Sequence, residues 1–341
     1  MLVVYIMQND KIVIYGAGIS GLVAAVNLKQ KGFDVCVCDI RKSIGGVSSW
    51  HPSVHHQTFD VISTSRYIGI DVSSCFKPVE CHMFSFYGKK SMMRNPENSF
   101  VCEKGPQSTS IESYLYQCAI SSGVEFKFNE SFGVDIIREN SSRECRVIVA
   151  TGLEEKPYKN LGIHSIPIQG YRAMKEHKNP VMVKSLFGNY TNHDFAYCAS
   201  SGSMTFSLLF SRLGINEENL DEYKRYLEDN YGESFDGWGF STGCVPVEKN
   251  LVKNNVVLAG TISGMIDPFY LNGISGALVS GKIASLYFTD REEAFRDFSA
   301  MTKNYNLKRR LKWIADKMPV KRITFPILAY ANNHFKWVGV V

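Results

Sequence analysis

A glycine-rich turn between two apolar strands constrains the fold of this chain more than any other feature. Residues 11–15 (Lys-Ile-Val-Ile-Tyr) form an apolar run typical of a strand buried on both faces. The turn Gly16-Ala-Gly18-Ile-Ser20-Gly21 follows, and residues 22–31 predict a helix that Gly32 ends. Residues 33–39 then alternate as a second strand. This order of elements predicts an α/β fold that contains a Rossmann-like unit.

The turn also predicts a binding site for a dinucleotide. Gly16 permits the tight turn, Gly18 lets a pyrophosphate approach the backbone, and Gly21 lets helix and strand pack closely. Ser20 lies at the helix N-terminus, where free N–H groups favour phosphate. Asp39 ends the second strand, where a carboxylate can accept hydrogen bonds from ribose hydroxyls. The alternative is a glycine-rich turn in an unrelated α/β protein.

A pair of adjacent glycines after the turn favours FAD over NAD as the cofactor. Asp39 is followed after five residues by Gly45-Gly46, and Arg41 lies between them as a further predicted cofactor contact. This spacing resembles that of the two-dinucleotide-binding-domain flavoproteins, in which the glycine pair lies near the FAD pyrophosphate. Taken alone, Gly45-Gly46 could be an ordinary loop.

Two distant segments extend the resemblance to roughly residues 11–290. Residues 146–152 form an apolar strand that ends in Ala-Thr151-Gly152, and residues 255–284 contain Gly260-Thr261 and then Asn-Gly273-Ile274 before Ser-Gly-Lys-x-Ala. The second segment resembles the geranylgeranyl reductase family within the para-hydroxybenzoate hydroxylase-like flavoproteins. The resemblance implies FAD contacts at Thr151, Gly152, Gly260, Thr261, Gly273 and Ile274.

Two positions depart from that family. Thr261 stands where the family has an aspartate that binds the ribityl chain, and Thr151 replaces an aspartate of the hydroxylase branch. A threonine hydroxyl still donates and accepts hydrogen bonds. The helix that follows Gly273 points its N-terminus at the flavin in this family, and we expect Asn272 to cap its first turn.

The motifs predict two interleaved domains and a tail. The FAD-binding domain takes residues 1–70, 100–155 and 250–290, and an α+β substrate domain with a mostly antiparallel sheet takes residues 71–99 and 156–249. Residues 181–187, 195–198 and 204–210 read as its strands and residues 216–230 as its helix. Residues 291–341 form a helical tail.

No acid–base pair is apparent, so catalytic residues stay unassigned. His51, His55 and His56 could reach a flavin or a metal, or could be solvated loop residues. Tyr197, Cys198 and Cys244 are expected to line a substrate pocket. The apolar strands around them favour a hydrophobic small molecule or lipid as the substrate.

Composition narrows the function classes. The net charge of +5 is too small to imply nucleic acid binding, and nine cysteines without a C-x-x-C pair predict reduced thiols, a cytoplasmic location and no metal site. The segment 303–318 is basic and contains Trp313. It predicts either contact with an anionic membrane or a docked helix with a solvated basic face.

The resemblance implies an FAD-dependent oxidoreductase that reduces carbon–carbon double bonds of an isoprenoid or lipid by hydride transfer from flavin N5. NADPH or another external donor would supply the electrons. One alternative is a flavin monooxygenase that uses O2 and NAD(P)H on the same fold. Another is a flavin-binding protein without turnover. The oligomeric state stays open.

Overall fold

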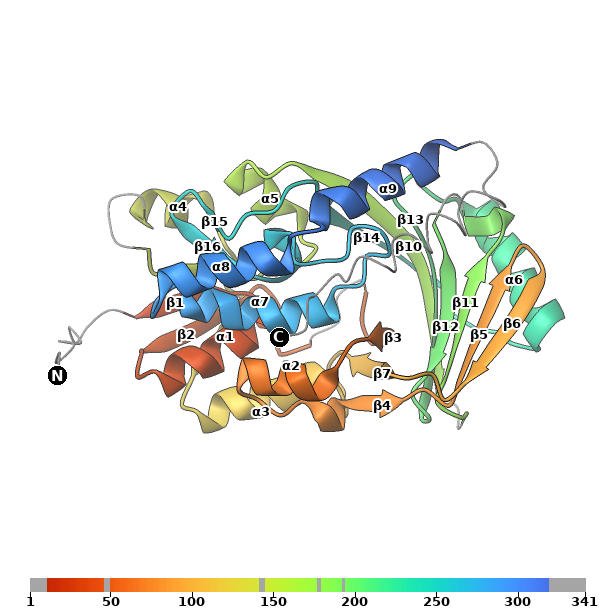
Figure 1. Cartoon of the computed structure of the whole chain (residues 1–341), viewed down its shortest axis with the longest axis horizontal. Coiled ribbons are helices and arrows are strands. Elements are labelled where there is room, and N and C mark those ends of the chain that lie inside the picture. Colours follow the sequence, from red (N-terminus) through yellow and green to blue (C-terminus); the bar gives the residue numbers. More distant parts are fainter. Residues whose placement is uncertain (1–10, 46–49, 141–144, 177–178, 192–193, 319–341) are drawn as a thin grey trace.

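The computed structural model describes residues 11–45, 50–140, 145–176, 179–191 and 194–318 and confirms the predicted α/β fold. A six-stranded sheet forms its first part (Figure 1). Its strand order is β15 (Val252–Lys253), β16 (Val256–Leu258), β9 (Val147–Val149), β1 (Ile12–Tyr15), β2 (Val35–Asp39) and β8 (Glu125–Phe128). All pairings are parallel except that of β15 with β16.

Helices cover both faces of this sheet, as its apolar central strands β1, β9 and β16 require. One face packs against α1 (Ile19–Gln30), α2 (Val61–Ile68), α3 (Ile111–Ser121), α7 (Ile274–Leu286) and α8 (Arg291–Met301). The other face packs against α4 (Val134–Asn140) and α5 (Glu155–Leu161). Alternation along β9 sends Ile148 into the first core and its two neighbours, Val147 and Val149, into the second.

A seven-stranded sheet forms the second part and lies on the right in Figure 1. Its order is β14 (Gly239–Pro246), β10 (Ser165–Glu176), β13 (Met204–Ser211), β12 (Ala196–Ser200), β11 (Met182–Phe187), β5 (Cys81–Phe86) and β6 (Lys89–Arg94). Only β11 and β5 pair in parallel. Helix α6 (Glu217–Tyr231) packs Leu220, Tyr223 and Leu227 on its outer face.

A small sheet joins the two parts. It consists of β3 (Ser53–Thr58), β7 (Ser99–Lys104) and β4 (Phe76–Pro78), all antiparallel. Phe76 and Cys102 belong to the core of the six-stranded sheet, whereas Val54 and Val101 belong to the core of the seven-stranded sheet. The small sheet is therefore shared by both cores.

Helix α9 (Tyr305–Lys317) buries part of its positive charge. Lys308 and Lys312 are about 3–4 % exposed and pair with Asp267 at 2.8 Å and with Asp194 at 3.0 Å. The expectation that the lysines of this segment face solvent or a membrane is wrong for these two, because buried carboxylates of both parts hold them inside. Trp313 remains 63 % exposed. Within the described ranges, none of the helices has both the length and the apolar character needed to cross a bilayer.

Candidate functional site

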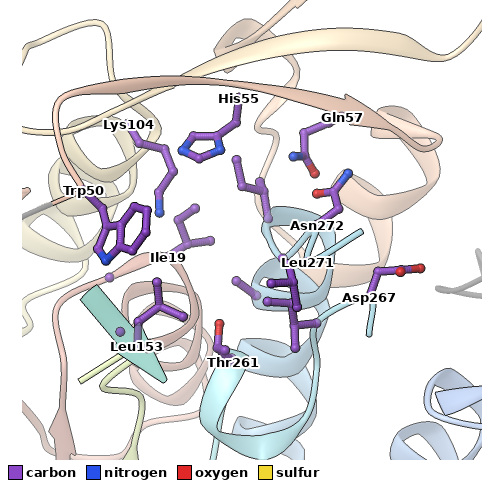
Figure 2. A pocket seen from close by; sticks show the side chains of 18 of the residues that line it. Ile19, Trp50, His55, Gln57, Lys104, Leu153, Thr261, Asp267, Leu271 and Asn272 are labelled. Atoms are coloured by element: carbon purple, nitrogen blue, oxygen red, sulfur yellow. The ribbon is translucent and has the colours of Figure 1, made fainter. Parts of the chain in front are cut away.

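A cavity of about 1430 Å³ lies where the three sheets meet. Its walls come from the glycine turn, the strand ends of the six-stranded sheet, the N-terminus of α7, strand β3 and the inner face of the seven-stranded sheet. Figure 2 shows side chains from these separate segments, among them His55, Gln57 and Thr261, around one space. Pockets for one small molecule usually measure ~300–1,000 Å³, so this cavity has room for a cofactor and a second molecule.

The glycine turn adopts the geometry that the sequence predicts. A Cβ on Gly16, whose φ is +114°, would lie 2.3 Å from the carbonyl oxygen of Ala150, and one on Gly21 would lie 1.9 Å from that of Gly16. A Cβ on Gly18 would meet no protein atom within 4 Å. Gly16, Gly18 and Ser20 line the cavity, whereas Gly21 packs behind the turn. The protein therefore needs glycine at positions 16 and 21 for its own packing, and leaves open space beside position 18.

Helix α1 begins directly at this open space. Gly18 is its N-cap residue and provides no side-chain cap. Ile19 and Ser20 at its first turn line the cavity. Free N–H groups and the helix dipole make such a terminus favourable for a phosphate group.

Asp39 is held rigidly at the end of β2. Its Oδ2 accepts from the Ala17 N–H at 2.7 Å, and its Oδ1 accepts from the Arg41 N–H at 2.8 Å. A carboxylate has about four acceptor positions, so both oxygens can still receive a ligand hydroxyl. The Arg41 guanidinium donates to Glu154 at 2.6 Å, and both side chains line the cavity.

The predicted glycine pair is only partly described. A Cβ on Gly45, at φ +54°, would lie 2.2 Å from the carbonyl oxygen of Gly105, so the two backbones touch here. Gly45 lines the cavity. Gly46 lies outside the described residues.

The remaining predicted cofactor residues also line the cavity: Thr151, Gly152, Gly260, Thr261, Gly273 and Ile274. Three buried polar atoms along the cavity have no hydrogen-bond partner among the residues that the structure describes, namely Thr151 Oγ1, Gln57 Oε1 and Asn272 Oδ1. Leaving such an atom unpaired costs ~1–3 kcal/mol. A polar ligand in the cavity would satisfy these atoms.

The expected cap of α7 is wrong. Gly273, not Asn272, is the N-cap residue, and no side chain caps the helix. The Asn272 amide instead donates to the carbonyl oxygen of His56 at 3.5 Å. This leaves the first turn of α7 open toward the cavity.

Four histidines line the cavity: His51, His55, His56 and His82. The alternative of solvated loop histidines is wrong for the predicted three, because all three line the cavity, His55 and His56 on β3 and His51 two residues before its start. Burial, reinforced by the charge of Lys104, lowers the pKa of His55 to about 3. Burial lowers the pKa of His56 to about 4. Among the described residues, no group of three or more His, Cys, Asp or Glu could hold a metal ion.

The structure brings two of the three predicted substrate residues to the cavity. Tyr197 and Cys244 line the cavity. Cys198 does not, because alternation along β12 turns it to the outer face of the sheet. There its Sγ donates to Ser207 Oγ at 3.2 Å beneath helix α6.

Several lining residues are not among the predicted site residues. They are Trp50, Gln57, Lys104, Asp267 and Lys308. Lys104 pairs with Glu112 at 3.4 Å, so the charges at this point of the wall balance locally. No local pattern distinguishes these residues, although a glutamine in a strand that enters the core could have drawn attention to Gln57.

Comparison with known proteins supports the fold. Residues 14–64 match the NAD(P)-binding Rossmann-like domain family. The chain is similar to a geranylgeranyl bacteriochlorophyll reductase-like protein from Thermoplasma acidophilum at 14 % identity and a TM-score of 0.69, covering 97 % of this chain and 94 % of that one. It is also similar to a triple mutant of the flavin-dependent brominase Bmp2 (10 % identity, TM-score 0.63, 95 % and 94 % covered).

A further similar structure is that of CtdE in complex with FAD, at 13 % identity and a TM-score of 0.60, covering 96 % of this chain and 100 % of that one. At such low identities these likenesses establish the fold alone. The chain therefore shares the mixed α/β fold found in these proteins.

Proposed function

We propose that this protein is an FAD-dependent oxidoreductase. The observation that carries the proposal is the open space beside Gly18, at the uncapped start of α1, with the Asp39 carboxylate fixed at the neighbouring strand end. A pyrophosphate fits the first feature and a ribose the second. The fold shared with an FAD complex supports the same cofactor.

The remaining predicted cofactor residues suit the rest of the cofactor. Thr151 Oγ1, which has no hydrogen-bond partner in the described part of the chain, and the Thr261 hydroxyl are available to polar atoms of FAD, although both replace aspartates of the resembled family. The open N-terminus of α7, beginning at Ile274, would stabilise negative charge by up to ~2 kcal/mol. When bound, FAD would supply hydride transfer, and the protein's part is to position the cofactor and to exclude water.

We propose an isoprenoid or similar lipid as the substrate, with reduction of its double bonds as the reaction. The inner face of the seven-stranded sheet supports this, because its cavity wall is mostly apolar and aromatic: Phe84, Val183, Phe187, Phe195, Leu208 and Phe210. NADPH or another external donor would reduce the flavin.

A flavin monooxygenase is the second candidate. Neutral imidazoles and the Tyr197 hydroxyl give the cavity hydrogen-bonding groups that an unsubstituted hydrocarbon chain would not use. A substrate with its own hydroxyl or carbonyl group would use them.

Flavin retention in Gly18→Val tests the cofactor. The valine side chain would occupy the open space, so we expect the purified variant to lose its flavin absorbance while its circular dichroism stays unchanged. Gly133→Val is the matched control, because a Cβ there also meets no atom within 4 Å but Gly133 does not line the cavity. Equal flavin content in both variants would show that the cofactor site is misplaced.

Mass spectrometry of a probe separates the two reactions. The flavin-loaded protein, reduced with dithionite, is incubated with geranylgeraniol under nitrogen and, in parallel, under oxygen. A gain of two hydrogens under nitrogen supports the reductase. A gain of oxygen only under oxygen supports the monooxygenase, and an unchanged probe in both would contradict isoprenoid chemistry.

We also propose that the exposed face of α9 contacts an anionic membrane. Trp313, 63 % exposed, lies on this face together with the exposed Arg309, Arg310 and Lys317. An aromatic ring beside cations suits the interface of acidic lipids. Co-sedimentation with phosphatidylserine vesicles should fall in Trp313→Ala with Arg310→Ala, and binding equal to wild type would refute the contact.

A further inference from the structure

A line of hydrogen bonds connects two walls of the cavity. His51 Nδ1 lies 2.9 Å from Ser53 Oγ, which in turn lies 2.9 Å from His55 Nε2. His55 Nδ1 lies 3.3 Å from the Tyr197 hydroxyl. Both ring nitrogens of His55 are engaged, so this imidazole bridges strand β3 and strand β12.

Strand alternation explains why two of these residues align. Ser53 and His55 occupy alternate positions of β3, and a strand turns such residues to one side. His56, the next residue along β3, bonds instead to Ser99 Oγ at 2.8 Å. His51 lies outside β3 and joins the line through its hydrogen bond with Ser53.

Both ends of the line and His55 reach the cavity, and Ser53 is the one member that is fully buried. His51, His55 and Tyr197 line the cavity, whereas Ser53 is fully buried. His51 follows the segment that contains Arg41 and Gly45, whereas Tyr197 belongs to the seven-stranded sheet. The line thus leads from the side of the proposed cofactor to the side of the proposed substrate.

Every member can both donate and accept a hydrogen bond. Neutral histidine has one N–H and one bare nitrogen, and serine and tyrosine hydroxyls do both. No carboxylate or ammonium group interrupts the line. Burial and the nearby charge of Lys104 keep the pKa of His55 at about 3, so its ring stays neutral near pH 7. A proton can then move by exchange between neutral tautomers.

We propose that Tyr197, His55, Ser53 and His51 form a proton relay for a molecule bound in the cavity. When the bound molecule accepts a proton, it takes the hydroxyl proton of Tyr197. His55 Nδ1–H then donates its proton to the Tyr197 oxygen. His55 Nε2 takes the hydroxyl proton of Ser53, which is replaced from His51 Nδ1. Water returns a proton to His51 Nε2. One proton enters, one leaves, every side chain ends neutral, and both histidines change tautomer.

The use of this relay in a reaction rests on the proposed function, whereas the hydrogen-bonded line itself requires no flavin. Nitrogen-15 NMR of the histidine rings tests it on the protein as purified. A continuous line requires His51 and His55 to share one tautomer, both Nδ1–H or both Nε2–H. If His51 carries Nδ1–H while His55 carries Nε2–H, both donate to Ser53 and the relay is refuted.

Variants test transmission along the line. Tyr197→Phe should change the ring nitrogen shifts of His51 as well as those of His55, and adding Ser53→Ala should restrict the change to His55. Tyr190→Phe is the control, because the Tyr190 hydroxyl has no hydrogen-bond partner among the described ranges and Tyr190 does not line the cavity. It should alter neither ring.

Unchanged His51 shifts in folded Tyr197→Phe would overturn the relay. If that variant does not fold, as judged by its amide spectrum, the tautomers of the wild-type protein still decide. Flavin absorbance is read from the same samples. Missing flavin would count against the proposed oxidoreductase without affecting the result for the relay.

Discussion

The four histidines that line the cavity are half-buried or buried, and this burial keeps their rings neutral. Burial lowers the pKa of His82 to about 3, with a smaller contribution from His56. Burial also lowers the pKa of His51 well below its usual range. Each ring instead bonds to a serine hydroxyl, as His82 does to Ser185 at 2.9 Å. The histidines thus add hydrogen-bonding groups to the cavity wall but no positive charge.

This neutrality predicts a loss of stability in mild acid. Below pH ~6.5 the unfolded chain binds a proton at His55 that the folded protein refuses until pH about 3, so the free energy of unfolding falls as the pH drops through this window. His55→Gln should reduce that slope by up to ~1.4 kcal/mol per pH unit. Urea denaturation at several pH values measures it.

The control for this prediction is His164→Gln. The side chain of His164 is 87 % exposed, so its removal should leave the slope nearly unchanged. Identical slopes in the wild type and His55→Gln would contradict the burial of His55 as a neutral ring.

Among the elements, helices α1 and α7 depend on each other through small residues. A Cβ on Gly281 of α7 would lie 2.5 Å from the carbonyl oxygen of Ser20 and 2.8 Å from Val23 Cβ on α1. Gly260 packs on the same residue, because its Cβ would lie 2.6 Å from Ser20 Oγ. The first turn of α1, which we propose to face the pyrophosphate, is thus fixed from two sides.

Gly281→Ala should therefore destabilise the protein although alanine favours helices. Overpacking costs ~1–3 kcal/mol, against ~1 kcal/mol gained in helix propensity. We expect a lower midpoint in urea denaturation and weaker retention of flavin. Gly133→Ala, where the added Cβ meets nothing within 4 Å, should show neither effect. A stabilised Gly281→Ala would contradict the close packing of α1 and α7.

At the scale of the whole molecule, α9 joins the two parts through buried ion pairs. Asp194, next to the seven-stranded sheet, binds Arg212 at 2.6 Å and Lys312 of α9 at 3.0 Å. Arg212 also donates to the carbonyl oxygens of Pro268 and Phe269, both at 2.7 Å. These bonds tie the seven-stranded sheet to the segment that leads into α7.

Asp194→Asn should cost up to ~3–5 kcal/mol of stability, because it removes the buried carboxylate that Arg212 and Lys312 share, and Lys312 then keeps only its ion pair with Asp316 among the pairs described here. Burial raises the pKa of Asp194, but the charges of Arg212 and Lys312 outweigh it and lower the value to about 2. The stabilisation is therefore present above pH ~4 and lost as the pH falls toward 2. Asp221→Asn, which removes an exposed pair with Lys224, should cost less than ~1 kcal/mol. Equal losses in both variants would refute the role of this network.

The sequence predicted the elements that local geometry dictates. The turn at Gly16 and Gly21 was predictable because only glycine tolerates the backbone contacts made there. The start of α7 was predictable from the resemblance, but the role of Asn272 was not, since its amide bonds to a residue of a distant strand. The outward turn of Cys198 follows from strand alternation only once the buried face is known.

The sequence alone therefore determined the Rossmann-like unit and the α/β class, and most of the cofactor residues that it predicted line the cavity. These features depend on steric limits and apolar periodicity within a few dozen residues. Only the tertiary structure decided which charges are buried, which face of β12 meets the cavity and that His55 reaches Tyr197. Those contacts join segments far apart in the chain, and burial there depends on how three sheets meet rather than on any local pattern.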